Sequence, residues 1–92
     1  MYINTVRDLM IALRMGSYTS IGSYPLYFVT RKGETFAPST VRAHVWQAAR
    51  DVRNQSGDWR VVAVDVNWED PDLLDDHTCE RIPSAYAEPE GA

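Results

Sequence analysis

Cysteine and long apolar runs are both scarce in this sequence. Its one cysteine, Cys79, excludes an internal disulfide bond. The longest apolar run near the N-terminus, from Leu9 to Leu13, is far shorter than the ~20 residues that a helix needs to cross a bilayer. No signal-peptide pattern is visible either. We therefore expect a soluble protein in a reducing, intracellular compartment.

The chain is also short, and its charge is unevenly distributed. Its 92 residues predict one domain over 1–92 with a thin core, in which the polar residues 87–92 form a flexible tail. Residues 1–60 carry eight Lys and Arg against four Asp and Glu, whereas residues 61–92 carry one Arg against nine Asp and Glu. The two halves could meet different partners, or their charges could mix on the folded surface.

Helical periodicity marks the first element. Thr5 can cap a helix over residues 6–13, whose apolar side chains recur at i, i+3, i+4 and i+7. Gly16 is a natural stop for this helix. A loop rich in Ser, Gly and Tyr follows at 17–25.

A hairpin, a helix and a long strand are predicted next. Strands at 26–30 and 35–36 flank a turn at 31–34, a helix runs from 38 to about 54, and a strand covers 59–68. The expected buried faces are Val41, Val45, Ala48 and Val52 on the helix, and Val62, Val64, Val66 and Trp68 on the strand. We therefore predict an α+β fold, in which a small antiparallel sheet (the hairpin plus one long strand) packs against one main helix. The N-terminal helix would cover a remaining edge or face.

The other face of the second predicted helix is basic. Arg42, Trp46, Arg50 and Arg53 fall within about 80° on a helical wheel. An indole beside guanidinium groups suits a phosphate backbone with a stacked base, and it suits an acidic protein patch equally well. The alternative is a solvated face on which Trp46 closes the edge of the core. The cations of the hairpin tip, which would extend this patch if the tip lies nearby, are Arg31 and Lys32.

Carboxylates dominate the turn after the long predicted strand. They are Glu69, Asp70, Asp72, Asp75 and Asp76. This cluster could mimic phosphates towards a nucleic-acid-binding protein, bind a divalent cation, or only solubilise a loop. Its spacing does not match an EF-hand, which needs a Gly and a terminal Glu at set positions. We predict a secondary acidic binding surface at Glu69, Asp70 and Asp72.

His77 and Cys79, with Asp75 close by, do not amount to a metal or catalytic site. Two side chains at i, i+2 do not complete a zinc site, and His44 is distant in sequence. A Cys–His catalytic pair also needs an orienting group and an oxyanion site, and nothing here supplies them. We therefore expect a protein that binds another macromolecule, with no catalysis, metal, cofactor or small-molecule substrate.

Four stretches carry a family resemblance that covers roughly residues 24–86. They are residues 24–30 (YPLYFVT), 58–62 (DWRVV), 66–73 (VNWEDPDL) and 81–86 (RIPSAY). In these stretches the chain resembles small zinc-binding proteins of unknown role that bacteriophages and prophages encode. In that family, two Cys-x-x-Cys pairs hold zinc.

The resemblance also shows where this chain departs from the family. The first Cys pair would fall on Ala37 and Thr40 and the second on Asp75 and Thr78, while Cys79 lies one residue beyond the expected place. The chain therefore looks like a zinc-knuckle scaffold that has lost its metal ligands, which puts a zinc-dependent role in doubt. The apolar packing that would replace the metal's contribution to folding lies around Phe36, Val41 and Leu73.

By length and general character, the chain is also similar to anti-CRISPR proteins of the type I-F class. That resemblance implies an inhibitor in the cytoplasm of an infected bacterial host. It would bind Cas proteins of a type I CRISPR surveillance complex, and the guide RNA of that complex, and would block target DNA by occlusion. The alternative is a metal-free, zinc-knuckle-like phage accessory protein that binds nucleic acid or a host protein.

Overall fold

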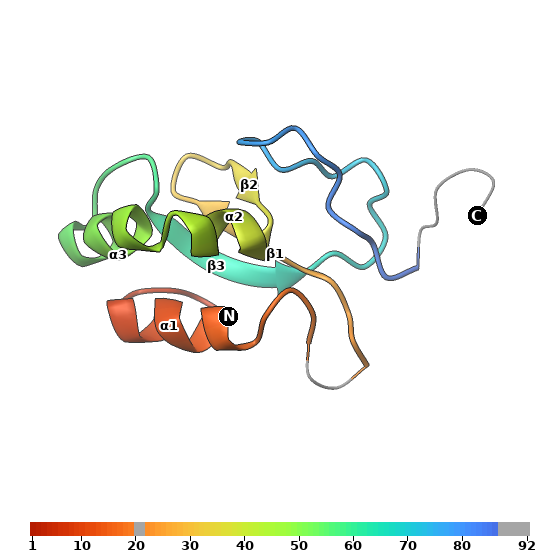
Figure 1. The fold of residues 1–92 in the computed structure, drawn as a ribbon, viewed down its shortest axis with the longest axis horizontal. Helices are drawn as coiled ribbons and strands as arrows, with labels where there is room; N and C mark the ends of the chain where they lie inside the picture. The colour runs from red at the N-terminus through yellow and green to blue at the C-terminus, as the bar shows by residue number, and fades with distance from the viewer. Residues whose placement is uncertain (20–21, 87–92) are drawn as a thin grey trace.

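The computed structural model describes residues 1–19 and 22–86, so the predicted tail at 87–92 lies outside the described residues. Along the chain, its elements are α1 (Val6–Arg14), β1 (Leu26–Thr30), β2 (Thr35–Phe36), α2 (Pro38–Ala43), α3 (Val45–Asn54) and β3 (Val61–Val66), as Figure 1 shows. None of the helices in the described part is long and apolar enough to cross a membrane.

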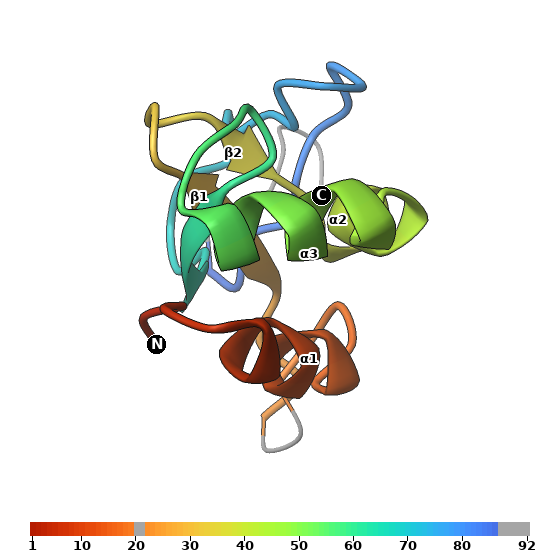
Figure 2. The ribbon, with the colours of Figure 1, turned by 90° about the vertical axis from the view of Figure 1, so that its left-hand side faces the viewer.

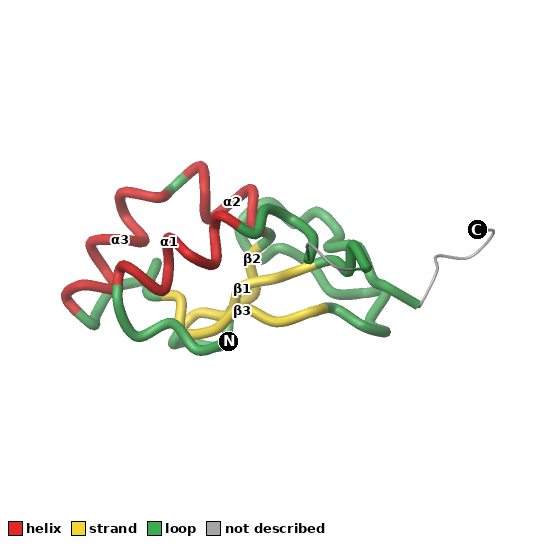
Figure 3. The backbone as a smooth tube through the Cα atoms, turned by 90° about the horizontal axis from the view of Figure 1, so that it is seen from below, coloured by secondary structure: helices red, strands yellow, loops and turns green. Residues whose placement is uncertain are grey.

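The strands form one antiparallel sheet in the order β2-β1-β3. Phe28 of the central strand lies opposite Phe36 of β2 and Val64 of β3. The helices lie together on one side of this sheet, as the views in Figures 2 and 3 show. The predicted α+β fold is therefore confirmed, together with the strand bounds at 26–30 and 35–36.

The first helix begins at a capping box. The Thr5 hydroxyl accepts a hydrogen bond from the amide of Asp8 at 3.1 Å, and the Asp8 carboxylate accepts one from the amide of Thr5 at 3.2 Å. Two donors that a helix start would otherwise leave unpaired are thus satisfied locally. The helix buries Leu9 and Ala12 and packs against α3.

The helix predicted over 38–54 is interrupted. His44 leaves the helical conformation (φ −117°, ψ 33°) and separates α2 from α3. Its ring instead stacks on Trp59, with 4.2 Å between ring centroids and 16° between ring planes. Trp59 itself precedes β3, so the strand is shorter than the predicted 59–68. The prediction of one continuous helix was wrong because it considered only local periodicity, and the partner of His44 lies beyond the end of α3.

The last strand, β3, contains an irregularity that changes which residues face the core. Its register against β1 shifts between Val29 and Thr30, so that Val62 is passed over. As a result Val61 and Val64 are both buried, whereas Val62 is only half-buried. The prediction that Val62 belongs to the buried face was therefore wrong, because strict alternation assumes an unbroken register.

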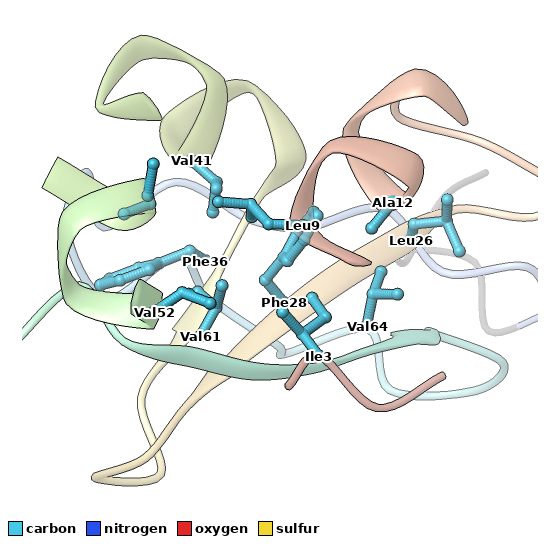
Figure 4. Packing of buried hydrophobic residues seen from close by; sticks show 12 residues of the cluster. Ile3, Leu9, Ala12, Leu26, Phe28, Phe36, Val41, Val52, Val61 and Val64 are labelled. Atoms are coloured by element: carbon cyan, nitrogen blue, oxygen red, sulfur yellow. The ribbon is translucent and has the colours of Figure 1, made fainter. Parts of the chain in front are cut away.

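One hydrophobic cluster joins the sheet to the helices (Figure 4). Phe28 of the central strand is fully buried within it. Val41, Ala48 and Val52 are buried as predicted, whereas Val45, at the break between α2 and α3, is only half-buried. This cluster fixes the orientation of α3, and therefore decides which of its side chains reach solvent.

Other parts of the chain cover both outer edges of the sheet. On the β3 side, residues 1–3 run alongside the strand, and the amide of Val64 donates to the carbonyl of Met1 at 2.9 Å. On the β2 side, the amide of Asp76 donates to the carbonyl of Thr35 at 2.8 Å, and the amide of Thr35 donates to the Asp76 carboxylate at 2.7 Å. The segment after β3 is thereby held against β2.

Candidate functional site

An exposed tryptophan stands beside two arginines on α3. Trp46, Arg50 and Arg53 lie at i, i+4 and i+7 and share one face of the helix, away from the buried Ala48 and Val52. Trp46 is 83% exposed. The alternative in which Trp46 closes the edge of the core is therefore wrong. We call Trp46, Arg50 and Arg53 the α3 surface.

Two arginines of the predicted basic face also have partners within the chain. Arg42 lies beyond the helix break, and its guanidinium donates to the carbonyl of Leu13 at 3.0 Å, which ties α2 to the end of α1. Arg50 donates through Nε to the buried carboxylate of Asp51 at 3.1 Å while its own side chain stays 64% exposed. Arg50 therefore still presents positive charge to a partner, whereas Arg42 has a structural role as well.

The hairpin tip lies against the loop that follows α3. The amide of Arg31 donates to the carbonyl of Arg60 at 2.9 Å, and Nζ of Lys32 lies 2.7 Å from the carboxylate of Asp58. This ion pair raises the pKa of Lys32 and lowers that of Asp58. The charge of Lys32 is thus paired within the chain, and the contacts of the tip are with this loop.

A buried carboxylate joins the segment before α2 to the segment after β3. Asp75 is 1% exposed. One of its oxygens accepts from the Thr40 hydroxyl at 2.5 Å and from the Ala37 amide at 2.8 Å. The other accepts from the amides of His77 at 2.7 Å and Thr78 at 2.9 Å. Four donors from two distant segments therefore surround one negative charge.

These contacts bring together the four positions at which the resemblance would place zinc ligands. Ala37 and Thr40 lie on one side of the Asp75 carboxylate, and Thr78 follows it on the other. The expectation that apolar packing alone takes the place of a metal was therefore incomplete, because a hydrogen-bonded carboxylate lies at the centre. The apolar residues named for that role behave differently: Phe36 and Val41 are buried, and Leu73 is only half-buried.

The charge of Asp75 is stabilised where it lies. Burial raises the pKa of this carboxyl, but the donors from Thr40, Ala37, Thr78 and His77 outweigh that effect and hold the pKa below its usual range. Within residues 1–19 and 22–86, no group of three or more His, Cys, Asp or Glu side chains is placed to hold a metal ion. Cys79 is free and exposed.

The acidic surface of Glu69, Asp70 and Asp72 is exposed, as predicted. Its backbone is held by Asn67, which is 3% exposed. The Asn67 side-chain amide donates to the carbonyls of Asp70 and Pro83, each at 2.9 Å. Nothing in the local pattern marked Asn67, because its partners come from a turn and from a segment further along the chain.

Three aromatic side chains lie next to this acidic turn. The ring of Trp68 lies 4.6 Å from that of Tyr24 and 5.9 Å from that of Tyr86, measured between centroids. Trp68 was predicted to be buried, but it is 44% exposed, and Tyr86 is 62% exposed. The prediction of burial was wrong because Trp68, although on the face that alternation gives it, lies beyond the end of β3 and outside the hydrophobic cluster. We call Tyr24, Trp68 and Tyr86 the aromatic surface.

A second ring cluster surrounds the helix break. The His77 ring lies 4.8 Å from His44 and 5.3 Å from Trp59, in edge-to-face orientation to both. The ring centroid of Phe36 lies 4.9 Å from that of Trp59 and 6.5 Å from that of His77. These rings pack the loop after β3 onto α2 and β2, so His77 has a packing role that the sequence did not indicate.

Comparisons with family models, curated proteins and solved structures find no match for this chain.

Proposed function

We propose that this protein acts by binding a macromolecular partner through the α3 surface. The observation that carries this proposal is the 83% exposure of Trp46 beside Arg50 and Arg53. Leaving a large indole in water forgoes the stabilisation that burial gives, and Trp and Arg together are the residues most enriched at binding hot spots. A partner that covers this face would bury the indole and pair with the guanidiniums.

The partner that we propose is a type I-F CRISPR surveillance complex, contacted through its Cas proteins and its guide RNA. The protein would be a phage-encoded inhibitor that blocks target DNA by occlusion. The resemblance of the chain to phage proteins and to anti-CRISPR proteins supports this proposal. The chemistry of the α3 surface is compatible with it, because two guanidiniums suit phosphates and an exposed indole can stack on a base.

The acidic surface would provide the second contact. Glu69, Asp70 and Asp72 follow β3, at the opposite end of the molecule from α3 in Figure 1. Exposed carboxylates can occupy positions that DNA phosphates would otherwise take on a basic Cas surface. An inhibitor with a basic and an acidic end could therefore touch both guide RNA and the DNA-binding surface of the complex.

A second candidate is a phage accessory protein that binds nucleic acid or a host protein on a metal-free zinc-knuckle scaffold. The convergence of Ala37, Thr40 and Thr78 on Asp75 favours this candidate. The two roles differ in their partner, since an accessory protein of this kind would bind nucleic acid without any Cas protein.

The deciding experiment measures target DNA binding by a purified type I-F surveillance complex, with and without this protein in molar excess. We expect the wild type to prevent the DNA mobility shift, and Arg50→Gln/Arg53→Gln to lose most of that inhibition. The matched control is Arg7→Gln/Arg14→Gln, which removes the same charge from α1. Unimpaired DNA binding in the presence of wild type would reject the inhibitor role, and direct binding of free RNA or DNA would then favour the accessory role.

A further inference from the structure

The aromatic surface lies where the core face of the sheet continues beyond the helices. In the β1–β3 pairing, Leu26 lies opposite Val66, and the same register carried outward places Tyr24 opposite Trp68. The amide of Asn67 still donates to the carbonyl of Pro25 at 2.9 Å, so the pairing does continue. The side chains at these positions would be core residues if a helix covered them. Instead, Trp68 is 44% exposed and Tyr24 is half-buried.

Hydrogen bonds hold these rings in fixed positions. The amide of Ala85 donates to the carbonyl of Asn67, and that of Tyr86 donates to the carbonyl of Trp68, each at 2.8 Å. The Tyr86 hydroxyl donates to the Tyr24 hydroxyl at 3.3 Å. The rings of Trp68 and Tyr86 are nearly parallel, with 12° between their planes and 5.9 Å between their centroids. The three rings are therefore already in contact in the chain without a partner.

The segment that carries Trp68 and Tyr86 is strongly acidic. Between residues 65 and 86 the sequence has seven Asp and Glu against one Arg. That one, Arg81, donates through Nε to the carbonyl of Pro71 at 2.7 Å. The exposed carboxylates of Glu69, Asp70 and Asp72, which follow Trp68 directly, add to the negative electrostatic potential of the ring faces.

We propose that the aromatic surface, with Glu69 and Asp72 beside it, is a docking site for arginine and lysine side chains on a basic segment of a protein partner. A guanidinium can lie flat on an indole or phenol face, and the flanking carboxylates add an ion pair. A nucleic acid would be repelled by the same carboxylates, so this site differs in partner from the α3 surface. Glu69 and Asp72 also belong to the acidic surface of the function proposed above, but recognition of a basic segment does not require that the partner be a Cas protein.

The test uses a capped decapeptide of alternating Arg and Gly, and the same peptide with the neutral arginine isostere citrulline. Binding is followed by NMR through the three Trp indole N–H signals, assigned with single Trp→Phe variants. We expect the Arg peptide to shift the Trp68 signal saturably and the citrulline peptide to bind at least about tenfold more weakly. Added salt should weaken the interaction.

Variants separate the ring contribution from the charge contribution. Tyr86→Leu keeps an apolar side chain but removes the π face, and should weaken binding of the Arg peptide about threefold. Tyr86→Phe keeps the π face and loses only the hydrogen bond to Tyr24, so it should weaken binding less than Tyr86→Leu does. Glu69→Gln/Asp72→Asn should weaken binding of the Arg peptide about fivefold. Trp46→Ala leaves this site intact, so peptide affinity should stay within about twofold of wild type whether or not the α3 surface binds a partner.

Several outcomes would overturn the proposal. One is equal binding of the Arg and citrulline peptides, and another is no saturable shift of the Trp68 signal up to about 5 mM peptide. A third is a Tyr86→Leu variant that binds as tightly as Tyr86→Phe. If the Trp68 and Trp46 signals both move when the free protein alone is concentrated, a second copy of this chain occupies the site, and the proposal of a foreign basic segment is wrong.

Discussion

The hydroxyl of Thr40 donates a 2.5 Å hydrogen bond to the carboxylate of Asp75, although 35 residues separate the two in sequence. This contact fixes the segment after β3 against the start of α2. It also helps to place the acidic surface and two members of the aromatic surface relative to the rest of the fold, because Glu69, Asp70, Asp72, Trp68 and Tyr86 all lie on the chain between β3 and residue 86.

Removing the charge of Asp75 should destabilise the protein. In Asp75→Asn, one of the two acceptor oxygens becomes an NH₂ group that faces N–H or O–H donors. We expect a loss of about 2–4 kcal/mol in the free energy of unfolding, because the donors around Asp75 would be left without a proper acceptor. Urea unfolding measures this loss. The exposed Asp72→Asn is the matched control, and a loss no larger than that of the control would contradict the assignment of Asp75 as the centre of the site.

The Asp75 carboxylate should make the stability of the protein depend on pH in the acidic range. Because the pKa of Asp75 is lower in the folded chain than in the unfolded one, its stabilising contribution is complete above the unfolded-state value of about 4 and is lost as pH falls through the folded-state value. The stability gap between wild type and Asp75→Asn should therefore be constant from about pH 5 to 7 and shrink below about pH 4. A gap that stays constant down to pH 2 would show that Asp75 does not carry this effect.

Zinc should not be needed for folding, but a designed variant should acquire a site for it. We expect the melting temperature of the wild type to be unchanged by a strong chelator. Replacing Ala37, Thr40, Asp75 and Thr78 together by Cys should produce a chain that binds Co²⁺ with the absorption of a tetrahedral thiolate site. The control is the double variant Ala37→Cys/Thr40→Cys, which has only half of the ligands. Absence of a Co²⁺ spectrum in the quadruple variant would show that the four positions do not converge as a metal site requires.

A side chain at Gly57 should be poorly tolerated. Gly57 has φ +110°, and a Cβ there would collide with the carboxyl group of Asp51. That carboxylate also accepts a hydrogen bond from the amide of Trp59 at 2.9 Å, so it cannot move freely. Gly33 has φ +90°, and a Cβ at that residue would meet no atom within 4 Å, so Gly33→Ala reports backbone strain alone. We expect Gly57→Ala to lose at least about 1 kcal/mol more than Gly33→Ala by chemical denaturation. Equal losses would mean that the loop around Gly57, which follows α3, adapts to the added side chain.

The irregular register of β3 predicts that the same substitution will have different effects at Val64 and at Val62. Val64 is 2% exposed in the core, whereas Val62 is only half-buried at the bulge. Val64→Asp should abolish cooperative folding, because burying an unpaired carboxylate costs several kcal/mol in a domain with about 5–10 kcal/mol to lose. Val62→Asp should leave a folded protein with a lower thermal midpoint. If Val62→Asp proves the more damaging of the two, the register is wrong.

Local signals in the sequence predicted the elements of the fold better than their junctions. The capping box at Thr5 and the strand at 26–30 were found because each depends on neighbours within a few residues. The break at His44 was missed because it accompanies stacking on Trp59, beyond the end of α3. Strict alternation misplaced Val62 and Trp68, since it contains no information about a bulge or about where a strand leaves the core.

The candidate sites show the same difference between signals that come from neighbouring residues and contacts between distant segments. Trp46, Arg50 and Arg53 could be grouped from the sequence because one helix carries all three. The aromatic surface could not, since Tyr24, Trp68 and Tyr86 come from three separate segments. Asp75 was grouped with the acidic cluster and with a weak set of metal ligands, and its donors at Ala37 and Thr40 became visible only in three dimensions.

The covered edges of the sheet restrict how any partner can be recognised. Residues 1–3 already pair with β3, and Asp76 already pairs with Thr35 of β2, so neither outer strand of the described sheet presents a free row of backbone donors and acceptors. Recognition by β-strand addition, in which main-chain hydrogen bonds supply affinity for almost any extended peptide, would first require one of these segments to leave. The protein must therefore distinguish its partners by side chains. The same covered edges would also hinder edge-to-edge aggregation of neighbouring copies.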